Sequence, residues 1–172
     1  PEDRLDSGMI LSLQTALKKA IQVIYQLEDN ELAAESLPSD LDRREILLYE
    51  ASEGGAGVLR RLIDDGLTEV AREALRICHF DPDTGADLKH AAGAREDCVA
   101  ACYDCLMTYA NQREHKDLDR AAIKDLLMDL SKTQMHASPG PASPDVHFEH
   151  LKQRCDSQLE RDWLDFILAR GL

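Results

Sequence analysis

The sequence predicts an α+β domain that is mostly helical, with amphipathic helices packed on a small β-hairpin or sheet edge. Hydrophobic residues make up 44% of the 172 residues but aromatic residues only 5%, so Leu, Ile, Val and Ala must build the core, a composition typical of helical packing. Apolar residues also recur with helical spacing in several segments. Two other short apolar runs flank a turn signal, which indicates a small amount of β structure.

The first helix is predicted over residues 9–27. Its apolar side chains recur with the period of a helix and so form one stripe. They are Leu13, Leu17, Ala20, Ile21 and Ile24. Asp6 or Ser7 can cap the exposed N–H groups of its first turn.

Two strands are predicted, over residues 31–37 and 45–52. The second is a compact apolar run, which is typical of a buried strand. Pro38-Ser39-Asp40 is the turn signal between the two. The first run contains Leu32-Ala33-Ala34-Glu35, which could as easily continue a helix.

A glycine-rich turn, Gly54-Gly55-Ala56-Gly57, follows the second strand, and an amphipathic helix starts at Val58. Unpaired N–H groups at a helix start can hold a phosphate, so Gly54, Gly55 and Gly57 are candidate nucleic-acid contacts. The turn lacks the Lys-Ser/Thr of a P-loop and therefore does not indicate nucleotide hydrolysis. A tight turn that needs glycine for positive φ is the alternative.

More helix is predicted on both sides of a cysteine-rich segment. Asp65-Gly66 should interrupt the helix that follows the glycine turn, and residues 67–77 should resume it. Another helix is predicted over residues 118–132, with its leucines on one side. Arg120, near its start, is expected to form a local ion pair or cap with a neighbour such as Asp119.

The formal charge of −13 argues against a protein whose whole surface binds nucleic acid, because phosphate contacts require local positive potential. Any DNA contact must come from a small patch. Arg60, Arg61, Arg113 and Lys116 are candidates for that patch, although exposed helix faces often carry such residues.

Four of the five cysteines, Cys78, Cys98, Cys102 and Cys105, crowd into 28 residues. Three of them are spaced at i, i+4 and i+7, so on a helix or in a tight knuckle their thiols share one face. Cys78 ends the preceding helix and can add a fourth thiolate across a polar loop. Zn²⁺ accepts four such ligands tetrahedrally, so the pattern predicts a Cys₄ zinc knuckle.

Two alternatives to this ligand set stay open. The cysteines could be small buried hydrophobes, as free cysteines often are. One of three nearby histidines, His79, His90 or His115, could replace a cysteine as ligand. A closed site has no open coordination position, so the zinc would be structural, and we expect no catalytic residues. Cys155 is expected to be an isolated core thiol.

A segment rich in proline, serine and glycine, residues 136–145, is predicted to be a linker because it can hold neither a helix nor a strand. It separates a domain over residues 1–135 from a helical segment over residues 146–172, where Ser157 and Glu160 form a capping box. No apolar run reaches the length of a membrane span and no signal-peptide pattern is present, so we expect a cytoplasmic location and no membrane partner.

Three motifs follow one another in the chain: the Gly-Gly-Ala-Gly turn after Leu47-Leu48-Tyr49-Glu50, the pair Cys102-Tyr103-Asp104-Cys105, and Leu118-Asp119-Arg120. In this order, over about residues 10–132, they resemble the MrfA-type zinc-binding domain. That domain occurs at the C-terminal end of many large bacterial superfamily 2 DEAD/DEAH-type helicases and in DISARM-type phage-defence proteins.

The resemblance implies ligands position by position. Cys102 and Cys105 match the CxxC pair of the family, and Cys78 matches the first cysteine of its upstream pair. Phe80 stands where the second cysteine of that pair would be expected, so Cys98 would have to take its place.

The resemblance also implies a function: a structural-zinc accessory domain of a bacterial DNA helicase or translocase in DNA repair or phage defence. Its partners would be DNA, helicase motor domains in cis and defence or repair proteins. An adaptor that contacts only proteins is the alternative. Residues 157–168 resemble the first helix of a Vsr-like nuclease domain, so we expect a truncated domain without its Asp…Glu-x-Lys core and therefore no enzymatic activity.

Overall fold

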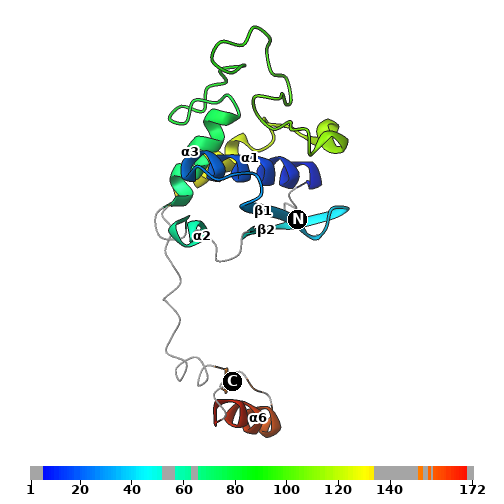
Figure 1. Cartoon of the computed structure of the whole chain (residues 1–172), viewed down its shortest axis with the longest axis vertical. Coiled ribbons are helices and arrows are strands. Elements are labelled where there is room, and N and C mark those ends of the chain that lie inside the picture. Colours follow the sequence, from blue (N-terminus) through cyan, green and yellow to red (C-terminus); the bar gives the residue numbers. More distant parts are fainter. Residues whose placement is uncertain are drawn as a thin grey trace. The chain divides into compact units, whose positions relative to one another are not determined.

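The computed structural model describes residues 6–51, 57–62, 66–133, 151–152, 155 and 157–169. The chain divides into an N-terminal unit, Pro1–Met135, and a C-terminal unit, His136–Leu172, and each is described by itself. The N-terminal unit is a helical domain with one hairpin (Figure 1), which confirms the predicted α+β class. Its elements are α1 (Ser7–Tyr25), β1 (Leu32–Ser39), β2 (Asp42–Glu50), α2 (Val58–Arg61), α3 (Leu67–Ile77), the 3₁₀ helix η2 (Gln112–Asp117) and α4 (Lys124–Leu130).

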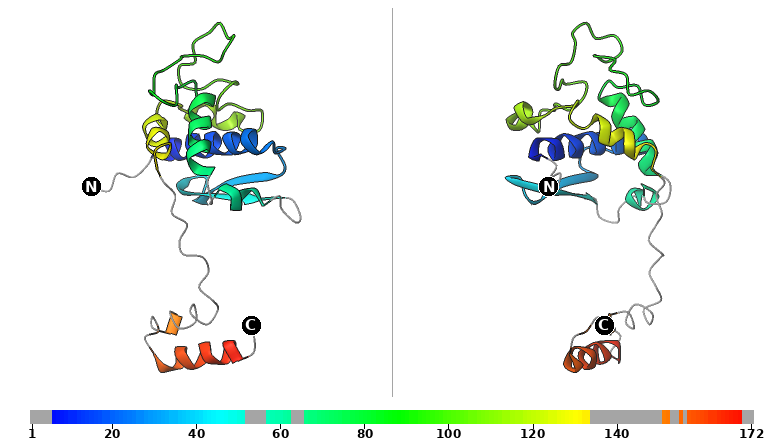
Figure 2. Two further views of the ribbon diagram at one scale, coloured as in Figure 1. Left: turned by 90° about the vertical axis from the view of Figure 1, so that its left-hand side faces the viewer. Right: turned by 180° about the vertical axis from the view of Figure 1, so that it is seen from behind.

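Helix α1 lies at the centre of the N-terminal unit. Its apolar residues repeat with the helical period, so one stripe is buried, and Ala16, Ala20 and Ile21 are fully covered. The helix packs against α3 and against both strands. The hairpin lies on one side of α1 and the long loop between α3 and α4 on the other (Figures 1 and 2). Asp6 occupies the predicted N-cap position, but its side chain makes no cap hydrogen bond.

The hairpin confirms the two predicted strands, with bounds shifted toward the turn. Strand β2 is not the buried strand that its apolar run indicated, because every residue of it is exposed or only partly covered. The strands pair antiparallel, from Leu32 opposite Glu50 to Ser39 opposite Asp42. Pro38 and Ser39 therefore belong to β1, and their assignment to the turn was wrong. A register shift between Leu37 and Pro38 lets a residue without an N–H group lie within the pairing. The alternative in which the first run continues a helix is excluded.

Helix α4 is shorter than the predicted helix over residues 118–132. The N–H of Asp119 donates to the hydroxyl of Ser12, 2.9 Å away, and the N–H of Arg120 donates to the carbonyl of Ala100, 2.8 Å away. Leu118 has an extended backbone (φ −85°, ψ 126°), so the chain is not yet helical where these long-range bonds form, and α4 starts only at Lys124.

Among the described residues of the N-terminal unit, a hydrophobic core connects its α-helices, β1 and the cysteine-rich loop. Its largest fully buried side chains include Ile21 of α1, Leu75 of α3 and Leu127 of α4. Leu106, directly after the last cysteine of the loop, is also fully buried within this cluster. The loop is thus attached to the core at the cysteines, although it contains little regular structure.

The C-terminal unit contains α6 (Gln158–Ala169). The predicted capping box is present: the N–H of Glu160 donates to the hydroxyl of Ser157 at 3.3 Å, and the N–H of Ser157 donates to the Glu160 carboxylate at 3.2 Å. The predicted linker, residues 136–145, lies outside the described residues, as do Gly54, Gly55 and the predicted helix interruption at Asp65. The division into domains at that linker stays a prediction.

Candidate metal centre

The metal centre begins with the turn that ends α3. The N–H of Phe80 donates to the carbonyl of Leu75 at 2.8 Å, and the N–H of His79 donates to that of Arg76 at 3.0 Å. These two bonds form a Schellman motif. His79 has a φ of 61° and occupies the left-handed position that glycine usually takes in this motif. The turn reverses the chain direction and buries the imidazole.

Cys102 and Cys105 form a second tight turn. The N–H groups of Cys105 and Met107 both donate to the carbonyl of Cys102, at 3.1 and 2.9 Å. In return, the N–H of Cys102 points at the Cys105 sulfur, 3.0 Å away. An N–H group directed at sulfur favours the thiolate form, so this turn suits a metal ligand. Lys19 of α1 donates to the carbonyls of Cys105 and Met107 and so attaches the turn to the central helix.

Four donor atoms converge between these two turns, from His79, Cys98, Cys102 and Cys105, and all lie within 4.8 Å of one another. The sulfur of Cys105 is 3.7 Å from that of Cys98 and 3.5 Å from that of Cys102. The Nε2 atom of His79 lies 3.2 Å from the Cys102 sulfur. A tetrahedral zinc ion with bonds of about 2.3 Å to sulfur and about 2.0 Å to nitrogen places its ligand atoms roughly 3.5 to 3.8 Å apart. The donor types and their spacing therefore fit Zn²⁺.

Cys78 is not among these four residues. It caps the C-terminus of α3, is fully buried and belongs to the hydrophobic core. Burial raises the pKa of its thiol well above the ordinary value. The structure thus brings together three of the four predicted cysteines and adds His79, which is one of the replacements left open above. The Cys₄ ligand set stays a prediction.

Burial also controls the protonation of the grouped side chains. It raises the pKa of the Cys98 thiol to about 12, and it raises the pKa of Cys105 as well. Without metal these thiols are protonated at neutral pH, because burial disfavours the charged thiolate and a second thiolate nearby adds to the effect. Burial lowers the pKa of His79, so its imidazole is neutral and offers a lone pair to a metal.

The other two candidate histidines lie outside the group. His90 is 3.2 Å from the carboxylate of Asp97 on the surface of the loop. The Nε2 atom of His115 lies 2.9 Å from the carbonyl of Thr108 and 3.0 Å from the side-chain oxygen of Asn111. Both imidazoles therefore have other partners.

The start of α2 is occupied by a carboxylate of the chain itself. Glu50 accepts the N–H groups of Gly57 and Leu59, both at 2.9 Å. A phosphate bound at Gly57 would have to displace this carboxylate, which favours the tight-turn explanation of the glycines. Of the basic candidates, Arg60 and Arg61 are exposed on α2.

The remaining basic candidates, Arg113 and Lys116, are exposed on η2. The four basic side chains are therefore available to a partner. The role of all these residues in nucleic-acid binding stays a prediction.

The family model described as the MrfA Zn-binding domain (MZB) matches residues 13–106. The chain belongs to this family. Comparisons with curated proteins and with solved structures give no match. The matched residues include all four members of the metal-binding group, and membership together with the fit of the four donors confirms Zn²⁺ as the structural cofactor of this MZB domain. Four protein ligands leave no open position for a substrate.

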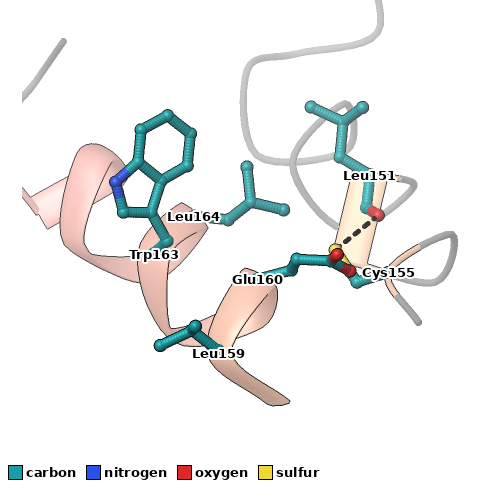
Figure 3. Close-up of a pocket in the computed structure, with 6 residues that line it drawn as sticks. All are labelled: Leu151, Cys155, Leu159, Glu160, Trp163 and Leu164. Carbon is teal, nitrogen blue, oxygen red and sulfur yellow. Dashed lines mark hydrogen bonds between the residues drawn. The ribbon is translucent and has the colours of Figure 1, made fainter. Parts of the chain in front are cut away.

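The C-terminal unit carries an apolar hollow of about 590 Å³ that lies outside the match. Figure 3 shows Leu159, Trp163 and Leu164 of α6 around it, with Leu151 and Cys155 facing them. The Cys155 thiol donates to the carbonyl of Leu151 at 3.3 Å. The resemblance of this segment to a Vsr-like nuclease helix stays a prediction. None of the described helices combines the length and apolar character that a membrane crossing requires.

Arg120, next to the metal centre, differs from the sequence prediction. Arg120 was expected to pair locally, beside Asp119, but its side chain is buried and pairs with Asp87. No local signal marked this pairing, because Asp87 lies 33 residues away and Asp119 is a nearer carboxylate.

Proposed function

We propose that this MZB domain is a structural-zinc accessory domain of a bacterial DNA helicase or translocase, and that His79, Cys98, Cys102 and Cys105 bind the zinc. The convergence of these four donor atoms within 4.8 Å carries the proposal, together with the family match. The domain would have no chemistry of its own, because its metal site is closed.

The zinc would stabilise a region that can bury little apolar surface. Between the end of α3 at Ile77 and the start of α4 at Lys124, the short helix η2 is the one regular element. His79 lies at the beginning of this region and the three cysteines near its middle, so a shared metal ion closes a loop of the chain. Metal binding in such a site contributes directly to the free energy of folding.

The domain would assist motor domains in cis and contact DNA through a local basic patch. The exposed side chains of Arg60, Arg61, Arg113 and Lys116 support such a contact. The charge of −13 argues that the contact is small and that motor domains contribute most of the affinity. DNA repair and phage defence are the pathways that the family resemblance supports.

A protein–protein adaptor is the second candidate. Its support is the acidic charge together with several exposed apolar side chains on the zinc loop: Val99 is 88% exposed, Tyr103 65% and Tyr109 86%. In a defence or repair complex these side chains would lie against another protein rather than DNA.

Two measurements on the full chain separate these candidates. Elemental analysis of the purified protein should give one zinc per chain, and its absence would overturn the zinc-site proposal. DNA binding is then titrated with salt, using single- and double-stranded oligonucleotides. Affinity that falls steeply with salt supports direct DNA contact. No binding at low salt, together with a full zinc content, favours the adaptor.

A further inference from the structure

One buried arginine lies behind the metal-binding group. Arg120 is only 3% exposed and belongs to the segment that joins η2 to α4. It lies outside the residues that the family model matches. Its own N–H donates to the carbonyl of Ala100, between two of the clustered cysteines in the chain. A buried guanidinium is costly unless all of its donors are paired, so its partners indicate why it is there.

Each of the five N–H donors of this guanidinium meets an acceptor. Two of them, on Nε and Nη2, donate to the carbonyl of Cys98 at 3.0 and 2.7 Å. One, on Nη1, donates to the carbonyl of Cys78 at 3.2 Å. The last two donate to the two carboxylate oxygens of Asp87, at 2.9 and 3.0 Å.

These contacts reach both ends of the metal-binding loop. Cys98 is one of the four grouped residues, whereas Cys78 and Phe80 are the immediate neighbours of His79 on either side. The guanidinium carbon lies 4.8 Å from the centre of the Phe80 ring. The guanidinium thus contacts the Cys78 carbonyl just before His79, the Phe80 ring just after it and the Cys98 carbonyl at the same time.

Asp87 completes this arrangement from the middle of the loop. The hydrogen bonds from Arg120 hold the pKa of the Asp87 carboxyl below its ordinary value, so the carboxylate is ionised at neutral pH. Its own oxygen also accepts the N–H of Lys89 at 2.8 Å. The loop is therefore held at its start, its middle and the first clustered cysteine by one side chain.

We propose that Arg120, held by Asp87, is a positioning residue for the zinc site, which sets the separation of His79 and Cys98 before the metal binds. The inference rests on the proposed zinc site but applies equally if Cys78 is the fourth ligand, because Arg120 binds its carbonyl. A planar fork is required, since a lysine ammonium carries the same charge but cannot reach three acceptor groups in one plane.

The test compares three forms of the full chain: the parent, the Arg120→Lys variant and the Asp87→Asn variant. Zinc affinity is measured by competition with a chromophoric chelator, and the ligand-field spectrum is recorded with Co²⁺ in place of zinc. We expect zinc affinity to fall about 10- to 100-fold in Arg120→Lys, the range found when outer partners of metal ligands are removed. The Co²⁺ bands should broaden, because the four donors no longer hold one geometry.

Arg72→Lys is the matched control. Arg72 also holds this loop, through hydrogen bonds to the carboxylate of Asp83 and the carbonyl of Pro82, and these bonds reach neither a grouped residue nor its neighbour in the chain. The zinc affinity and the Co²⁺ spectrum of the Arg72→Lys variant should equal those of the parent. A general loosening of the loop would instead lower the affinity of both variants alike, and that result would overturn the positioning role.

Equal zinc affinity in the parent and in Arg120→Lys would overturn the positioning role of Arg120 but leave the zinc site in place. A parent that binds no zinc would overturn both the zinc site and the positioning role. If Arg120→Lys does not fold, Asp87→Asn decides, because Asp87 is half exposed and its replacement leaves the guanidinium in place. Parent-like zinc affinity in Asp87→Asn would then contradict the proposed role of the pair.

Discussion

The hydroxyl of Ser12 accepts the N–H of Asp119 at 2.9 Å, and this bond joins α1 to the segment that carries Arg120. The same hydroxyl donates to the carbonyl of Gly8 at 2.8 Å, and Ser12 is fully buried. A polar side chain inside α1 thus connects the central helix to the support of the metal site.

Replacement of Ser12 by Ala should lower the free energy of unfolding by about 0.5–1.5 kcal/mol, because the hydrogen bond between the N–H of Asp119 and the buried Ser12 hydroxyl is lost. Urea unfolding monitored by circular dichroism measures it. Thr15→Ala is the control: the Thr15 hydroxyl donates to the carbonyl of Leu11 in the same way but does not contact Asp119. A loss of the same size in both variants would contradict the role given to the Asp119 bond.

Removal of zinc should lower the melting temperature of the N-terminal unit by more than about 10 °C, because metal binding contributes to folding. Differential scanning calorimetry of the full chain, with and without a strong chelator, measures the shift. Adding zinc back in excess should restore the original transition. An unchanged transition in chelator would show that the loop folds without metal.

Cys102→Ser should abolish stoichiometric zinc binding, since it removes one of the four grouped donors. Cys155→Ser is the control, because this thiol donates to Leu151 in the C-terminal unit. Zinc content after dialysis, measured by elemental analysis, distinguishes them. Retention of one zinc per chain by Cys102→Ser would remove Cys102 from the ligand set.

The fourth ligand is decided by comparing His79→Gly with Cys78→Ala. Glycine suits the left-handed backbone at position 79, so His79→Gly removes the imidazole without adding strain. We expect zinc affinity to fall at least about 10-fold in His79→Gly and to change little in Cys78→Ala. The Co²⁺ spectrum of the parent should show three sulfur ligands and one nitrogen. The reverse pattern would restore the predicted Cys₄ set.

Zinc binding should become tighter as the pH rises. The raised pKa values of Cys98 and Cys105 mean that protons must leave these thiols when metal binds, whereas neutral His79 releases none at pH 7. All three grouped cysteines, Cys98, Cys102 and Cys105, would bind zinc as thiolates, so calorimetry in buffers of different ionisation enthalpy should detect about three protons released per zinc. About four protons would indicate a fourth thiolate, from Cys78. Affinity that is independent of pH would contradict thiolate ligation.

Much of the fold could be predicted from local patterns. The apolar stripe of α1 follows directly from spacing, because side chains repeat with the period of the element that carries them. The hairpin was indicated by two apolar runs that flank a turn signal, and the first run could as easily have continued a helix. Helix α4 was predicted too long since residues 118–123 carry a helical pattern as well. Leu118 is extended instead, and the N–H groups of Asp119 and Arg120 bond to Ser12 and Ala100, which are distant acceptors that no local pattern reports.

The sequence by itself determined that this chain is a mostly helical α+β domain with a zinc site, because composition, periodicity and the clustering of thiols are properties of neighbouring residues. Only the tertiary structure decided that His79 joins Cys98, Cys102 and Cys105, and that Arg120 pairs with Asp87. The left-handed backbone of His79 at the end of α3 and the pairing of Arg120 with a carboxylate 33 residues away both depend on long-range packing, which patterns among neighbouring residues do not report.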